Sequence, residues 1–377
     1  MSLLLLLLPD EVLVQIAYRL YHDQKSPSPR ASQTAILPLF HASRRLYNIG
    51  YPLFYSQVSI SNGQQLQDAL NAPGMSLVHT IAFKSRGVDG AFPLLSNVLT
   101  TSSLGSLKSL RSIIIDGFDL QDANGSVTSL FRNLGPRIKE LSLWNSIHAE
   151  EVLGTTISTC CVDIEHLSFK FSHSCLVPSS HASSESVLLN LAKNLRSIQF
   201  LEFHKVMVVN GSFVDALIKN PSPSLKHFHF KNIGTHFCPL TDQSISQLLQ
   251  NFSLESLGVL HCWGLTQIAL NAIQTYGQTL LQLRISTTKF GVHLSNIVGA
   301  VRELPMLELL EIDGLDVAVF DQVDEFLEIL KYTPKTLKTM TLSGLNSAGI
   351  GAVDYLDKQF KKRFPAVQVN LDFQQST

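Results

Sequence analysis

The sequence predicts an α/β protein: a short, all-helical N-terminal module followed by a curved solenoid with parallel strands on its concave side and helices on its convex side. Three observations predict this fold: an apolar pattern that returns at a nearly constant interval, helical periodicity between its copies, and an amphipathic segment within the first twenty residues. We place the helical module at residues 1–58, with a loop at 22–33, and a solenoid of about ten to eleven repeats at residues 59–377.

The repeated pattern is an apolar residue, two other residues, a second apolar residue, one other residue and a third apolar residue. Eleven copies follow one another at steps of 26 to 32 residues, which unrelated strands would not match. The copies are Val78-Ile81-Phe83, Leu110-Ile113-Ile115, Ile138-Leu141-Leu143, Ile164-Leu167-Phe169, Leu195-Ile198-Phe200, Leu225-Phe228-Phe230, Leu254-Leu257-Val259, Leu280-Leu283-Ile285, Leu307-Leu310-Ile312, Leu337-Met340-Leu342 and Ala366-Val369-Leu371.

Each copy ends in two apolar residues that point the same way on a strand. One short strand cannot bury that face alone, so successive copies must stack against one another. The sequence between copies predicts helices, and Thr241 followed by Asp242 predicts a helix cap. The predicted helices are Val127–Leu134, Glu150–Ile157, Ser186–Ala192, Phe213–Ile218, Thr241–Leu249 and Gln322–Leu330.

The pattern and its spacing resemble the leucine-rich repeat (LRR) over roughly residues 76–373. The stretch LESLGVLHCWGLT at residues 254–266 is similar to the cysteine-containing subtype, in which the cysteine caps the turn after the strand. This resemblance implies a structural role for Cys262.

The N-terminal segments LPDEVLVQIAYRL (residues 8–20) and TAILPLFHASRRLYNIGYPLFY (residues 34–55) resemble the F-box in its fungal form, a module of three helices. The chain departs from the family in the long connection at 22–33 and in Pro38, which removes a hydrogen bond from the second helix. The matching positions are Leu8, Pro9, Glu11, Val12, Leu13, Ile16, Leu20, Leu39, Ser43, Arg44, Tyr47, Pro52, Leu53 and Tyr55.

This resemblance implies a partner, the Skp-family adaptor of SCF-type cullin-RING ubiquitin ligases, and through it the cullin and RING subunits. The chain would then be a substrate-recognition subunit of the ligase, with no catalytic residues of its own. The implied adaptor-binding residues are Leu8, Pro9, Glu11, Leu13, Ile16, Leu20 and Leu39. The alternative is an LRR interaction scaffold without a ligase role, in which the first 55 residues only cap the solenoid.

The concave face is the expected site for an unidentified protein substrate, because residues between the buried strand positions point away from the core. Aromatic and arginine side chains at such positions are common binding anchors. The candidate substrate-binding residues are Trp144, His166, Lys170, His227, His229, Lys231, Arg284, Glu311 and Asp313.

Composition excludes several other classes of function. The net charge of −1 gives no overall field to favour nucleic acid or anionic membrane. The leucine run at residues 3–8 is too short to span a bilayer and lacks the flanks of a secretory signal. Five irregularly spaced cysteines favour reduced thiols and a cytoplasmic or nuclear location. The grouping of Cys160, Cys161, His173 and Cys175 lacks the spacing of a zinc site, so we expect no metal and no cofactor.

Overall fold

The computed structural model describes residues 9, 12–16, 43–72, 74–85, 92–99, 104, 107–122, 124–170, 181–204, 209–220, 224–231, 240–262, 265–286, 294–314, 331, 334–343 and 350–372. The chain forms two compact units, Met1–Ile164 with Ser172–Val177, and Glu165–Phe171 with Pro178–Thr377. Among the described residues, no helix has both the length and the hydrophobicity that crossing a bilayer requires.

The first unit contains a helical stretch at residues 12–16 and then helices that alternate with four strands. Its strands are β1 (Gln57–Ile60), β2 (Thr80–Lys84), β3 (Ser112–Asp116) and β4 (Glu140–Trp144). Its helices are α3 (Arg44–Ser56), α4 (Gly63–Leu70), α5 (Leu95–Val98), α6 (Ser126–Leu134), α7 (Ala149–Val152) and α8 (Ser158–Cys160), with 3-10 turns η2 (Met75–Leu77) and η4 (Gly135–Arg137) and the π-helical turn η5 (Leu153–Ile157).

The second unit repeats the same alternation with eight described strands. They are β5 (His166–Lys170), β6 (Phe200–His204), β7 (His227–Lys231), β8 (Ser256–Leu260), β9 (Gln282–Ser286), β10 (Leu309–Asp313), β11 (Thr339–Ser343) and β12 (Gln368–Asp372). The helices are α9 (His181–Asn194), α10 (Gly211–Ile218), α11 (Asp242–Asn251), α12 (Gln267–Tyr276), α13 (Leu294–Arg302) and α15 (Ile350–Arg363).

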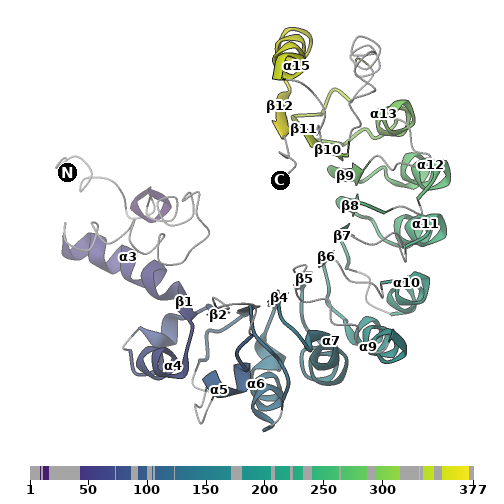
Figure 1. The fold of residues 1–377 in the computed structure, drawn as a ribbon. Coiled ribbons are helices and arrows are strands. Elements are labelled where there is room, and N and C mark those ends of the chain that lie inside the picture. Colours follow the sequence, from purple (N-terminus) through teal and green to yellow (C-terminus); the bar gives the residue numbers. More distant parts are fainter. Residues whose placement is uncertain are drawn as a thin grey trace. The chain divides into compact units, whose positions relative to one another are not determined.

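Strands that follow one another in sequence are parallel neighbours in the sheet of each unit. In the second unit the strands line the inner side of an arc and the helices its outer side (Figure 1). A strand followed by a helix can return to the same sheet edge only as a parallel neighbour, so serial repeats give this order. The predicted α/β solenoid is confirmed.

The core confirms the repeat at every predicted strand except two. In the last copy, Ala366 is exposed and Val369 and Leu371 are only half-buried, although β12 forms there. The other exception lies at β6. The pattern Leu195-Ile198-Phe200 places the strand three residues too early. In β6 the buried strand residues are Leu201 and Phe203, and Phe200 lies on the opposite face, only half-buried. The correct copy is therefore Ile198-Leu201-Phe203, and this shift changes which side chains of β6 meet solvent.

Strand β1 is an element that the repeat pattern did not predict. It begins directly after α3 and pairs with β2, so the sheet starts before Val78, where the pattern places its first copy. The backbone amide of His79 also donates to the carbonyl of Ser56, the last residue of α3. The predicted boundary at residue 58 falls inside β1, and the separate module at residues 1–58 stays a prediction.

The predicted helices agree with α6, α9, α10 and α11, whereas the stretch predicted as Glu150–Ile157 is interrupted by the π-helical turn η5. Side-chain hydroxyls there bond back to the helix: Ser158 Oγ donates to the Gly154 carbonyl at 2.6 Å, and Thr159 Oγ1 to the Thr155 carbonyl at 3.0 Å. Glycine and such hydroxyl bonds weaken regular α-helix. The helix predicted at 322–330 lies outside the described residues.

Thr241 caps α11 as predicted, in a capping box with Ser244. The Thr241 hydroxyl accepts the Ser244 amide at 3.3 Å. We expect Thr241→Ala to lower the free energy of unfolding by about 1 kcal/mol, because a helix donor loses its acceptor. Urea denaturation measures this loss. The matched control is Thr275→Ala, inside α12, where alanine favours helix and no loss is expected; equal losses from both variants would contradict the capping role.

Candidate functional site

The candidate site is the open face of the second unit, which we define as the sheet face turned away from the helices. Side chains alternate along each strand, and the parallel register aligns the open-face residues in three rows across the strands. From β5 onward the first row is His166, Phe200, His227, Ser256, Gln282, Leu309, Thr339 and Gln368; the second is Ser168, Glu202, His229, Gly258, Arg284, Glu311, Thr341 and Asn370; the third is Lys170, His204, Lys231, Leu260, Ser286, Asp313 and Ser343.

Glu202 is the centre of a polar network on β5 and β6. Its Oε2 accepts a hydrogen bond from Ser168 Oγ at 2.8 Å and lies 2.9 Å from Lys170 Nζ, while its Oε1 lies 3.1 Å from His204 Nε2. Burial alone would raise the pKa of Glu202, but the hydrogen bonds from His204, Lys170 and Ser168 lower that pKa well below its ordinary value. Glu202 therefore stays ionised and holds both basic side chains in place.

Four aromatic rings gather beside this network, and we call His166, Phe200, His227 and His229 the His–Phe platform. The Phe200 ring is stacked on His166 with a centroid distance of 3.9 Å. It also meets His229 edge-on at 5.3 Å and His227 at a tilt at 5.6 Å. Phe200 is thus an apolar centre ringed by three imidazoles.

His229 lies across the neighbouring strand because Gly258 leaves room for its ring. A Cβ atom at Gly258 would come within 3.1 Å of His229 Cδ2. The His229 Nε2 lies 2.7 Å from Ser256 Oγ. Burial lowers the pKa of His229, and the positive charge of Arg284 lowers it further, to about 4. The imidazole is therefore neutral at pH 7.

A second network connects β8, β10 and β11. Asp313 Oδ2 lies 2.8 Å from His261 Nε2, and its Oδ1 accepts a hydrogen bond from Ser343 Oγ at 2.8 Å. Burial raises the pKa of Asp313, but the bonds from His261 and Ser343 outweigh it and lower the pKa to about 2. His261 reaches this position from a left-handed backbone conformation, with φ of 56°. Beside this network, Arg284 Nε and Glu311 Oε2 are 3.4 Å apart.

These contacts suit recognition of another molecule better than bond chemistry. Ser256 and His229 are close enough to be a nucleophile and its base, but Ser256 is only 1% exposed, so its hydroxyl does not face a substrate. Ser343 donates to a carboxylate and not to an imidazole. Within the described ranges, no three His, Cys, Asp or Glu side chains are grouped to hold a metal ion.

The structure brings most of the sequence-predicted substrate residues together on one face. His166, Lys170, His227, His229, Lys231, Arg284 and Glu311 lie half-buried on the open face of the second unit, and Asp313 lies there fully buried. Asp313 is already occupied by His261 and Ser343 and is only 5% exposed, so its role is to order this face. Trp144 belongs to the first unit, half-buried at the end of β4.

Sequence reasoning missed Phe200, Glu202 and His204, because the shifted repeat assigned Phe200 to the core. It also missed His261, whose carboxylate partner is two strands away in the sheet. Reading β6 as Ile198-Leu201-Phe203 gives the same apolar pattern and places all three residues on the open face. That alternative match was the signal available in the sequence.

Of the predicted adaptor-binding residues, the structure describes Pro9, Leu13 and Ile16. Pro9 is exposed, Leu13 is buried, and Ile16 lies half-buried. The amide of Leu13 donates to the carbonyl of Pro9 at 3.1 Å. Leu8, Glu11, Leu20 and Leu39 lie outside the described residues. Adaptor binding by this group stays a prediction.

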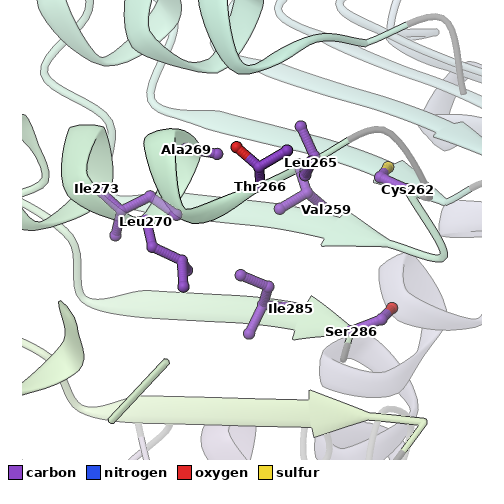
Figure 2. Close-up of a pocket in the computed structure, with 9 residues that line it drawn as sticks. All are labelled: Val259, Cys262, Leu265, Thr266, Ala269, Leu270, Ile273, Ile285 and Ser286. Carbon is purple, nitrogen blue, oxygen red and sulfur yellow. The ribbon is translucent and has the colours of Figure 1, made fainter. Parts of the chain in front are cut away.

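The described cysteines, Cys160, Cys161 and Cys262, form no disulfide bonds with one another. Cys262 is buried in the turn after β8, and its Sγ donates to the Leu260 carbonyl at 3.6 Å, as expected for a residue that caps this turn. It lines an apolar cavity of about 10 Å³ between α12, β8 and β9 (Figure 2), which is large enough for at most one water. Burial raises the pKa of Cys161 to about 12, so this thiol stays protonated.

Comparison with known proteins finds solved structures whose backbones align with this chain. No family model matches the chain, and no curated protein matches it. A chain in the crystal structure of the Rad7 and Elc1 complex of yeast aligns at 12% identity and a TM-score of 0.48, covering 96% of this chain and 92% of that one. A protein from Bacteroides fragilis aligns at 13% identity and a TM-score of 0.35, covering 85% and 73%. An LRR protein from Leptospira interrogans aligns at 12% identity and a TM-score of 0.25, covering 83% and 100%.

Proposed function

We propose that this chain is the substrate-recognition subunit of an SCF-type cullin-RING ubiquitin ligase. Its F-box-like N-terminus would bind a Skp-family adaptor, and the open face of its repeats would bind the protein to be modified. The chain would contribute no catalytic group. It would accelerate ubiquitin transfer by holding the target close to the charged ubiquitin carrier.

The observation that carries this proposal is the exposure of the N-terminal helical stretch. Pro9 is exposed, and Val12 and Val14 expose 38% and 45% of their surface. Leu13, between the two valines, is 2% exposed and is thus covered by the chain itself. Apolar side chains that remain exposed beside a buried residue are suited to a protein partner. These residues lie in the segment that resembles the adaptor-binding part of the F-box.

The adaptor contact is tested by co-purifying the full chain with a Skp-family adaptor. We expect the double variant Leu8→Ala/Pro9→Ala to weaken capture by about tenfold or more, because truncated interface anchors typically cost over 1 kcal/mol. Gln15→Ala, an exposed change in the same helical stretch, is the control and keeps capture. Circular dichroism and the unfolding midpoint report whether each variant is folded. Undiminished capture by the folded double variant would overturn the proposal.

A second candidate function is an LRR interaction scaffold without a ligase role. It is favoured by the direct passage of α3 into β1, because a helix that continues into the sheet also suits a cap for the repeat array. The same co-purification separates the two candidates. A scaffold would recover neither adaptor nor cullin, although its open face would still bind protein.

A further inference from the structure

The charge on the open face is unevenly distributed among the strands. Residues of β5, β6 and β7 include two lysines, Lys170 and Lys231, and Glu202 is their single acidic side chain. From β8 onward, the described networks pair positive with negative groups, Arg284 with Glu311 and His261 with Asp313. The unbalanced positive charge therefore lies at β5–β7.

Within this group, Glu202 is already engaged by Lys170, His204 and Ser168. Lys231, in the same third row, makes no hydrogen bond or ion pair with a described residue, and it acts on Asp313 only through its charge, which contributes to the lowered pKa of that carboxyl group. An ammonium group at the edge of an ordered network, with no carboxylate hydrogen-bonded to it, is a site for an anionic group from outside. We call Lys170, His204 and Lys231 the cationic row.

The His–Phe platform lies on the same face as the cationic row. Positions two and four residues apart on a strand are separated by about 7 and 13 Å, so an extended peptide of four or five residues spans both features. Phe200 offers an aromatic surface to a ring, and stacked or edge-on aromatic pairs contribute about 0.5–1.5 kcal/mol beyond the area they bury.

We propose that the open face of β5–β7 binds an extended acidic segment of a partner protein, with an aromatic side chain of that segment on the His–Phe platform and its carboxylates at the cationic row. This inference rests on the proposed function, in which the open face selects a protein. A single-stranded nucleic acid would also present rings and negative charge. Two lysines and a net chain charge of −1 are a poor match for a polyanion, so a peptide is favoured.

The test is selection from a random dodecapeptide display library on the full-length chain, followed by fluorescence polarisation with the selected peptides after synthesis. We expect enrichment of Asp and Glu together with one Phe, Tyr or Trp, and affinity that falls as salt rises. We expect Lys231→Glu and Phe200→Ala each to weaken binding about tenfold or more. Lys219→Glu, the same charge change on the exposed C-terminal end of α10, is the control and leaves the affinity unchanged.

A folding defect is separated from a lost contact by reversing the peptide charge. A peptide whose carboxylates near Lys231 are replaced by lysine should bind Lys231→Glu better than it binds the wild-type chain. No enrichment, enrichment of basic peptides, unchanged affinity of Lys231→Glu, or tighter binding of a twenty-nucleotide oligothymidine than of any selected peptide would overturn the proposal. If the same preparation still captures the adaptor, such a result refutes the acidic ligand and leaves the ligase role standing.

Discussion

Replacing Phe203 with alanine is expected to lower the free energy of unfolding by about 3–5 kcal/mol, whereas Phe200→Ala should cost about 1 kcal/mol. The two residues are three positions apart on β6. Phe203 is fully buried and meets Phe213 of α10 at a ring distance of 5.5 Å. Phe200 lies half-buried on the open face, against His166.

The difference between these costs arises from the cavity that each change leaves. The space left by Phe203 is enclosed by packed side chains of the core, so it cannot collapse or admit water without cost. The space left by Phe200 is open to solvent, and the main loss is a ring contact with histidine. Urea denaturation of both variants and the wild type, followed by circular dichroism, gives the comparison.

This pair of variants also tests the register of β6. If Phe200→Ala were the more destabilising change, the strand would have the register of the pattern Leu195-Ile198-Phe200. The Glu202 network would then lose its place on the open face. Similar losses from both variants would equally contradict the structure, because the two rings would then be equally buried.

Lowering the pH from 7 to 4.5 is expected to destabilise the protein, with about 2 kcal/mol of the loss due to His229 alone. The pKa of His229 is about 4 in the folded chain, below the ordinary value of 6.5. Between these values the unfolded chain binds a proton that the folded chain does not. Stability from the neutral imidazole is therefore fully present above about pH 6.5 and is lost as the pH falls towards 4.

The carboxylates of the open face act in a lower pH window. The pKa of Asp313 is lowered to about 2, and that of Glu202 is also well below its ordinary value. Their stabilising contribution is present above their unfolded pKa values and is lost only as the pH falls below about 4. His227, whose pKa burial also lowers, adds to the His229 effect in the same direction.

The His229 contribution is measured with His229→Gln, which keeps a polar group near Ser256 but does not titrate. Denaturation at pH 7.0, 5.5 and 4.5 should show a loss of stability in the variant that is about 2 kcal/mol smaller than in the wild type. A variant that loses as much as the wild type would show that His229 is protonated as readily in the folded as in the unfolded chain. That result would contradict the buried position of the His229 imidazole beside Arg284 and Ser256.

The sequence by itself determined the fold class and most of the core. A strand alternates with a period of two, and a lone strand cannot bury its apolar side. Regular copies of the pattern therefore had to stack as a parallel array. The two strand errors have local causes. At β6, the repeat pattern fits the residues from Leu195 to Phe203 in two overlapping ways. Strand β1 has only two apolar residues, Val58 and Ile60, which are too few to complete the pattern.

Only the tertiary structure decided which open-face residues act together. The choice between the two matches at β6 depends on packing against α10. The pattern of apolar residues in the sequence does not reveal this packing. His261 and Asp313 are 52 residues apart in sequence, and they meet because β8, β9 and β10 stack in register and because His261 adopts a left-handed backbone conformation. The same stacking places Lys170 and His204 on Glu202 and leaves Lys231 without a hydrogen-bonded carboxylate, since charge balance on a sheet depends on neighbours across the strands and not along the chain.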